Sequence, residues 1–267
     1  MAQYKTWERV LNQHYGCKVL ENWGAGVTPS KSTEKVSETV ARAIVRDSAG
    51  LEPGARLSSE AMMLERYKVS RGSLREALRF LEVQGLIAIK PGPGGGPILI
   101  GPDVESMAKM QSLHFHLMGA KYSDLVAARV RLEPQIARMA ATRQDRAALE
   151  QLRPYVREVD ESNILIDADY LRAATGFHRV VCSLSGNSVL DMLASSLNQI
   201  VLTRLRGAVF SDDMRHGIVC DHIAIAEAIL DGNGPLAELL MRDHMSEYIS
   251  GVAEANQMAF DDVVDWR

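Results

Sequence analysis

Three arginines at four-residue spacing are the side chains of this sequence best suited to meet an anionic surface. Arg71, Arg75 and Arg79 share one face of a predicted helix, because residues four apart lie above one another along a helix. A guanidinium can fork onto a phosphate, or onto the edge of a guanine in the major groove of DNA. This row therefore predicts contact with nucleic acid.

The helix that carries the row is predicted from an apolar stripe along another face. The stripe, at i, i+3, i+4 and i+7, consists of Leu74, Ala77, Leu78 and Leu81. Ser70 stands at the N-cap position, so the first-turn N–H groups at Arg71, Gly72 and Ser73 point outward, where they attract phosphate oxygens. Gly85 is expected to end the helix.

A glycine-rich hairpin is predicted after this helix. Residues 86–90 and 98–100 are predicted strands, and residues 91–97 form a connecting loop with four glycines. Such a loop brings backbone close to a ligand, and we expect Gly92 to contact the minor groove or the sugar-phosphate chain. A basic row on an isolated helix is usually a solvated face. The combination of cap, basic helix and hairpin is what favours DNA.

The same segment resembles the winged helix-turn-helix of the GntR family of bacterial transcription regulators. About sixty residues carry the resemblance, with LEPGARLSSE and VSRGSLREALRFLEVQGLI in the family's order and spacing. The residues predicted to contact DNA are Ser70, Arg71, Gly72, Ser73, Arg75 and Gly92. The family often has Arg directly after the Ser-Glu pair, whereas this chain has Ala61, so one phosphate or base contact is expected to be missing.

Charge is unevenly distributed along the chain, whose net charge is −4. Residues 31–90 hold eleven Lys or Arg against eight Asp or Glu, and residues 91–267 hold sixteen against twenty-four. A basic module on an acidic body is expected when one part approaches phosphate and another part has a different ligand. No apolar run approaches a membrane span and the N-terminus lacks a signal core, so we expect a cytoplasmic protein. Cys17, Cys182 and Cys220 are expected to be reduced thiols.

Periodicity and turn signals predict a mainly α protein with two domains. The predicted divisions are a flexible or loosely docked N-terminal extension, a winged helix-turn-helix domain, an all-helical domain for ligand binding and dimerisation, and a C-terminal tail, at residues 1–30, 31–101, 102–251 and 252–267. Ser32 or Thr33 is expected to cap a first helix through about Ala49, with Val36 on its buried side. The turn Gly101-Pro102-Asp103 is predicted to be the hinge between the two domains. The helices predicted after this hinge are residues 104–118, 123–142, 146–160, 167–184, 189–205, 213–230 and 236–251.

The helical domain resembles the FCD ligand-binding domain of one GntR subfamily. The matching pieces are RVRLEPQIARMAA, GFHRVVCSLSGN and DHIAIAEAILDGNGPLAELLMRDHM. The resemblance implies that His178, His222 and His244, which lie in these pieces, bind a divalent metal, for which Zn²⁺ is the best candidate. Neutral imidazoles suit zinc, and three of them would leave coordination positions for a small carboxylate. The alternative is that these histidines have a structural role only, as hydrogen-bonded residues of the core.

One expected ligand is missing from this set. Metal-binding members carry Asp one turn before the first histidine, and here that position is Ala174. Three outcomes are open: a three-histidine site with more open positions, replacement by a neighbour such as Cys182, or no metal. Asp167 and Asp169 lie about two turns or more away, too far on a straight helix.

Arg129 stands where the subfamily places an arginine aimed into the pocket. Its guanidinium suits a bidentate grip on a carboxylate, so Arg129 is predicted to bind the effector together with the three histidines. Glu133, one turn later, could instead hold Arg129 in an i, i+4 ion pair.

These features favour a ligand-responsive transcription regulator and no enzyme. We expect a repressor that binds a palindromic operator in double-stranded DNA as a homodimer and responds to a small organic acid. A variant of this hypothesis has a metal-free pocket for an apolar or acyl effector. A metal-dependent hydrolase fused to a DNA-binding module is the third hypothesis, although the sequence has no H-E-x-x-H, general base or nucleophile motif beside the histidines.

Overall fold

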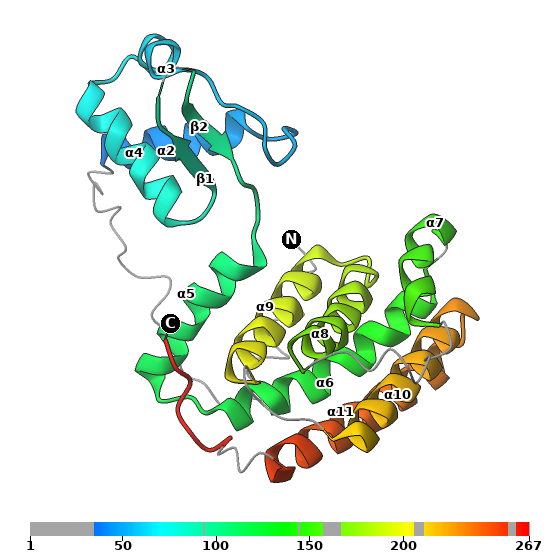
Figure 1. Cartoon of the computed structure of the whole chain (residues 1–267). Helices are drawn as coiled ribbons and strands as arrows, with labels where there is room; N and C mark the ends of the chain where they lie inside the picture. Colours follow the sequence, from blue (N-terminus) through cyan, green and yellow to red (C-terminus); the bar gives the residue numbers. More distant parts are fainter. Residues whose placement is uncertain are drawn as a thin grey trace, which may run out of the picture. The chain divides into compact units, whose positions relative to one another are not determined.

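The computed structural model describes residues 35–92, 94–143, 145–156, 167–205, 211–255 and 260–266 (Figure 1). One unit runs through Val83 and resumes over Ile87–Leu99, and the other comprises Gln84–Leu86 and Ile100–Arg267. The division after Leu99 falls two residues before the predicted boundary at 101. The predicted extension at residues 1–30 and the predicted caps Ser32 and Thr33 lie outside the described residues.

The N-terminal unit contains the three helices and the hairpin that the sequence predicts. Its elements are α2 (Val36–Asp47), α3 (Glu60–Tyr67), α4 (Arg71–Val83), β1 (Ile87–Lys90) and β2 (Gly96–Leu99). The strands pair antiparallel, with Ile87 opposite Leu99 and Lys90 opposite Gly96. Pro97 was predicted to lie in the loop but belongs to β2, opposite Ile89, so the loop is shorter than expected.

The buried stripe of α2 begins one residue later than predicted. Ser37, Val40 and Ile44 are buried, whereas Val36 is 55% exposed. Residues 37, 40 and 44 follow the i, i+3, i+7 spacing of one helix face, and Val36 is rotated away from that face by about 100°. Lys35 is the observed N-cap, and its side chain makes no capping hydrogen bond.

The C-terminal unit is helical throughout its described part. Its elements are α5 (Val104–Met118), α6 (Tyr122–Ala141), α7 (Arg146–Leu149), the 3₁₀ helix η2 (Glu150–Tyr155), α8 (Asp167–Ser183), α9 (Ser188–Leu205), α10 (Asp212–Leu230) and α11 (Gly234–Ala255). The single helix predicted over residues 146–160 was wrong, since α7 ends at Leu149. Pro154 lacks an N–H donor and its ring crowds the carbonyl four residues earlier, which disfavours an α-helix at this point, and η2 forms instead. Among the described residues, no helix is both long and apolar enough to cross a membrane.

Helix α6 is the element around which this unit packs. It contacts α8, α9, α10 and α11, and Figure 1 shows it running through the middle of the unit. One apolar cluster surrounds Phe177, Ile225 and Met241, and a second one surrounds Leu125 and Val201. The polar side chains of α6 that enter the interior therefore lie among four other helices.

The C-terminal tail predicted from residue 252 begins, in the structure, within helix α11. Helix α11 continues to Ala255, and residues 260–266 dock on the start of α6. Tyr122 N donates to the carbonyl of Asp262 at 3.1 Å, and Ser123 N donates to that of Phe260 at 2.8 Å. These carbonyls satisfy N–H groups that the first turn of a helix leaves without partners. Val264 is fully buried, so the segment belongs to the helical unit.

Candidate DNA-binding surface and candidate metal centre

Helix α4 begins and is oriented as the sequence predicts. Ser70 Oγ accepts a hydrogen bond from Ser73 N at 3.1 Å, which makes Ser70 the N-cap. All four stripe residues are 5% exposed or less. Arg71, Arg75 and Arg79 are exposed, as are Ser70 and Gly72. The basic row is therefore accessible, while its contact with DNA stays a prediction.

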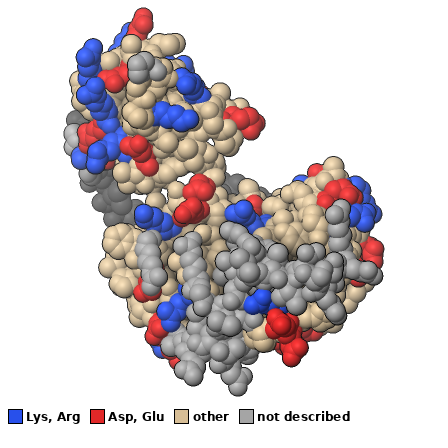
Figure 2. Space-filling model, viewed as in Figure 1, with Lys and Arg blue, Asp and Glu red and all other residues tan. Residues whose placement is uncertain are grey.

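Helix α4 has a neighbour on α3 that the spacing of the sequence does not indicate. Arg75 Nε lies 3.3 Å from Glu60 Oε1, and both side chains are substantially exposed. Glu60 is the first residue of α3, whose N-cap Ser59 accepts from Met62 N. A surface ion pair contributes at most about 1 kcal/mol, so it orients Arg75 without fixing it. Figure 2 shows Lys and Arg side chains on the visible face of this unit, interspersed with Asp and Glu.

The loop between the strands uses glycine where other residues would not fit. Gly92 is exposed with φ +93°, and a Cβ on Gly95 would lie 2.2 Å from the carbonyl oxygen of Lys90. Arg56 Nη1 donates to the carbonyl of Gly94, so an arginine from before α3 holds the loop. Nothing in the spacing of the sequence marks Arg56 for this role.

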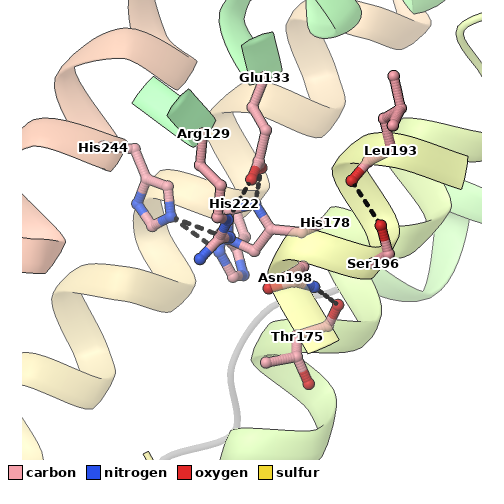
Figure 3. Close-up of polar contacts among 9 residues, drawn as sticks. All are labelled: Arg129, Glu133, Thr175, His178, Leu193, Ser196, Asn198, His222 and His244. Carbon is pink, nitrogen blue, oxygen red and sulfur yellow. Dashed lines mark hydrogen bonds and ion pairs between the residues drawn. The ribbon is translucent and has the colours of Figure 1, made fainter. Parts of the chain in front are cut away.

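The three histidines meet in the interior of the helical unit. His178 on α8, His222 on α10 and His244 on α11 are each 4% exposed or less. Nε2 of His244 lies 3.2 Å from Nε2 of His222 and 3.4 Å from Nε2 of His178 (Figure 3). The structure thus brings together residues that are 22 and 44 positions apart in the chain.

Each ring is oriented by a different neighbour. Glu133 Oε2 lies 2.5 Å from His178 Nδ1, and Asp221 Oδ2 lies 3.0 Å from His244 Nδ1. His222 stacks on Phe177, with ring centroids 4.0 Å apart and planes 20° from parallel. Carboxylates behind metal-binding imidazoles fix the tautomer and the ring orientation. The sequence analysis missed these roles of Glu133 and Asp221, because the partners come from other helices.

Glu133 is an ionised carboxylate inside the protein. Burial opposes its ionisation, but the Arg129 guanidinium and His178 lower the pKa of Glu133 from 4.5 to about 2. Arg129 Nε donates to Glu133 Oε1 at 2.7 Å, and both side chains are 2% exposed. Burial lowers the pKa of His178 and of His222, which favours the neutral imidazoles that metals require.

The positions of the ring nitrogens fit a cation. In the tautomers that carry the proton on Nδ1, Glu133 and Asp221 accept from His178 and His244, and the Nε2 atom of each ring carries a lone pair. The two Nε2 atoms lie 3.4 Å apart, and a cation shared between two such lone pairs would stabilise this arrangement. Two nitrogens bound to tetrahedral zinc at about 2.0–2.1 Å lie about 3.3–3.4 Å apart. The residues therefore fit a divalent metal.

A narrow cavity adjoins the Nε2 atoms. Its wall consists of Arg129, Ala174, Thr175, His178, Asn198, Leu202, Leu205, Ile218, His222 and His244. Asn198 Nδ2 donates to the Thr175 carbonyl at 3.3 Å, which ties α9 to α8. Arg129 forms the predicted i, i+4 ion pair with Glu133 through Nε and also lines the cavity, while its binding of an effector stays a prediction.

No described side chain takes the place of the metal ligand that is missing at Ala174. Among the described residues, the converging ligand atoms belong to the three histidines alone, all within 4.8 Å of one another. Cys182 is buried in the apolar cluster around Phe177, where burial raises the pKa of its thiol. Its Sγ atom is not among the ligand atoms that converge with those of the three histidines. The side chains of Asp167 and Asp169 lie outside the described part of the chain.

Comparison with known proteins covers both units. Residues 33–95 match the model described as bacterial regulatory proteins, gntR family, and residues 124–247 match the FCD domain. The chain is 28% identical over 217 residues to the HTH-type transcriptional regulator LutR of Bacillus subtilis, covering 77% of this chain and 96% of that protein. It is 25% identical over 224 residues to the HTH-type transcriptional repressor NanR of Citrobacter rodentium, covering 81% and 83%.

Two further similarities extend this comparison. The Glc operon transcriptional activator of Escherichia coli is 26% identical over 220 residues, covering 79% of this chain and 85% of that protein. The solved structure of a Streptococcus agalactiae GntR protein, 23% identical, superposes with a TM-score of 0.61 over 80% of this chain and 97% of that one. The structural similarity shows that the fold is shared.

Proposed function

We propose, from the premise that this chain belongs to the gntR family of bacterial regulatory proteins and carries an FCD domain, that it is a metabolite-responsive repressor. That it regulates transcription and is not an enzyme follows from the family and from its named relatives. This excludes the hydrolase hypothesis. Its operator, its assembly and its effector are the proposed parts.

The DNA-binding part of the proposal is supported by the exposed row on α4 and the glycine loop beside it. Arg71 is exposed at the start of α4, beside the exposed residues Ser70 and Gly72, and such a helix start suits phosphate and a guanine edge together. The N–H of Ser73, predicted to point outward, instead donates to the N-cap Ser70. One such helix reads too few bases to select a site, so we propose a homodimer on a palindromic operator. The proposed place of action is the cytoplasm, where bacterial DNA lies.

The direction of regulation is the least constrained part. NanR of Citrobacter rodentium is named a repressor, whereas the Glc operon protein of Escherichia coli is named an activator. We propose repression, with release of the operator when the effector binds the helical domain. Coupling of this kind requires the effector to favour one of two arrangements of the paired DNA-binding units.

We propose that His178, His222 and His244 hold a divalent metal, with Zn²⁺ favoured by an all-nitrogen ligand set. The observation that carries this is the convergence of three buried Nε2 atoms, with that of His244 3.2 Å from that of His222 and 3.4 Å from that of His178. When bound, the ion supplies a positive charge that attracts an anionic effector. Glu133 and Asp221 keep the rings in the correct tautomer, and Phe177 holds the plane of His222.

The proposed effector is a small carboxylate, a class that both the histidine cluster and Arg129 suit. Leu202, Leu205 and Ile218 line the same cavity, and this apolar wall favours a second candidate, an apolar or acyl effector in a metal-free pocket. Metal analysis of protein purified without chelators separates the two. About one zinc per chain, lost in a His178→Ala, His222→Ala variant, supports the first candidate, and metal-free protein that zinc does not stabilise against heat supports the second.

A further inference from the structure

We propose that the metal and a carboxylate effector bind this protein as an interdependent pair, because the histidine cluster offers three neutral nitrogens and no negatively charged ligand. This rests on the proposed metal and carboxylate. It adds that each of the two binds weakly when the other is absent.

The acidic groups of the site lie behind the histidines. Glu133 contacts Nδ1 of His178 (Figure 3), and Asp221 contacts Nδ1 of His244. Both carboxylates therefore lie on the Nδ1 side of the rings, away from the Nε2 atoms. The charge of Glu133 is further shared with Arg129, and Asp221 is 45% exposed to screening solvent. Within the described part of the chain, no carboxylate or thiolate joins the three converging nitrogens.

A divalent ion among neutral ligands keeps its full charge in a buried place. Burying an uncompensated charge is costly, so three imidazoles alone should hold the ion less tightly than a set that includes an anion. The cavity wall beside the nitrogens contains the methyl group of Ala174, which is 8% exposed and offers no lone pair. Since the described residues supply no anionic ligand to the cluster, we propose that a bound anion supplies the compensating charge.

The cavity also indicates what kind of anion fits. Its enclosed space is about 10 Å³, about one water-sized group, so the cavity must widen to admit an ion together with even a small anion. Of the five N–H donors of Arg129, the one on Nε donates to Glu133. Asn198 lies in the same cavity wall as Arg129. A carboxylate head group meets these donors and the ion together. Without the ion it meets three neutral rings and an arginine that already has a counter-charge.

The interdependence can be measured through the binding of either ligand. If the carboxylate raises the affinity for Zn²⁺, Zn²⁺ raises the affinity for the carboxylate by the same factor. Full-length protein stripped of metal is titrated with Zn²⁺ against a chromophoric chelator, in sodium acetate and in sodium perchlorate of equal ionic strength. Acetate is expected to tighten zinc binding about tenfold or more, after correction for zinc acetate measured without protein. The NMR signal of ¹³C-acetate should broaden only when the protein holds zinc.

Two variants at one position isolate the role of charge. Ala174→Asp places a carboxylate one turn before His178, so zinc should bind more tightly in perchlorate than it does to the unaltered protein, and acetate should change its affinity less than about threefold. Ala174→Asn, of nearly equal size and uncharged, should keep the full acetate dependence. Circular dichroism of the metal-free variants checks that both fold.

The outcomes distinguish this inference from the function on which it rests. If the unaltered protein binds zinc equally well in acetate and perchlorate, interdependence is refuted while the metal proposal stands. If Ala174→Asn loses the acetate dependence as fully as Ala174→Asp, side-chain size and not charge is responsible, which also refutes it. If zinc binds in neither solution, the proposed metal function and this inference fail together.

Discussion

Replacing Glu133 with Gln tests the buried Arg129–Glu133–His178 arrangement most sharply. The substitution keeps the size of the side chain but removes the charge that Arg129 Nε meets at 2.7 Å and His178 Nδ1 meets at 2.5 Å. Breaking a buried ion pair by removing one partner typically costs about 3–5 kcal/mol, because the other charge stays buried without compensation. A carboxylate whose pKa falls from 4.5 to about 2 on folding contributes a similar amount, about 3 kcal/mol near neutral pH.

The pH dependence of this contribution has a definite sign. Because folding lowers the pKa of Glu133, its stabilisation is present above pH 4.5 and is lost as the pH falls from 4.5 towards 2. Urea unfolding of the metal-free protein, followed by circular dichroism, should therefore show the free-energy difference between the unaltered protein and Glu133→Gln shrinking over that interval.

Two companion variants separate stability from the orientation of the histidine. Arg129→Met with Glu133→Gln removes both charges and should recover much of the lost stability, while zinc affinity stays about 10–100-fold reduced. Asp221→Asn changes a carboxylate that is 45% exposed, so it should cost under about 1 kcal/mol of stability yet weaken zinc binding. If Glu133→Gln unfolds at the same urea concentration as the unaltered protein and binds zinc equally well, the roles given to Glu133 are wrong.

Three other changes test separate parts of the molecule. Arg71→Ala with Arg75→Ala should weaken operator binding in fluorescence anisotropy by about 1–3 kcal/mol per arginine and leave zinc affinity unchanged; normal binding would refute the assignment of α4. Val264→Ala should lower the free energy of unfolding by about 2 kcal/mol, whereas the matched change at Val263, 39% exposed, should have little effect; equal effects would show that the segment is not docked. Gly95→Ala should weaken operator binding at unchanged zinc affinity, because its Cβ meets the Lys90 carbonyl at 2.2 Å; unaltered binding would remove the loop from the DNA contact.

The sequence predicted those parts of the fold that depend on local spacing. The stripe of α4 and the Ser70 cap concern residues within two turns of one another, and the helical pattern after the hinge is equally local. Errors occurred where a local pattern met a stronger constraint. Pro154 stopped α7, and the first turn of α2 buried Ser37 in place of Val36.

The site was predictable only through its histidines. The histidines were expected to converge because they lie in the three segments that resemble the FCD domain. Their spacing in the sequence alone did not require it. Glu133 was visible as an i, i+4 partner of Arg129, while its second contact to His178 crosses between helices and follows no period. The same holds for Asp221 with His244, and for the docking of residues 260–266 on α6. Contacts of this kind depend on packing between elements.

X-ray absorption at the zinc edge of the loaded protein tests the proposed centre most directly. Three imidazole nitrogens at about 2.0–2.1 Å are predicted, with a light oxygen scatterer added when acetate is present. A sulfur shell at about 2.3 Å, or fewer than three imidazoles per zinc, would contradict a centre built from His178, His222 and His244.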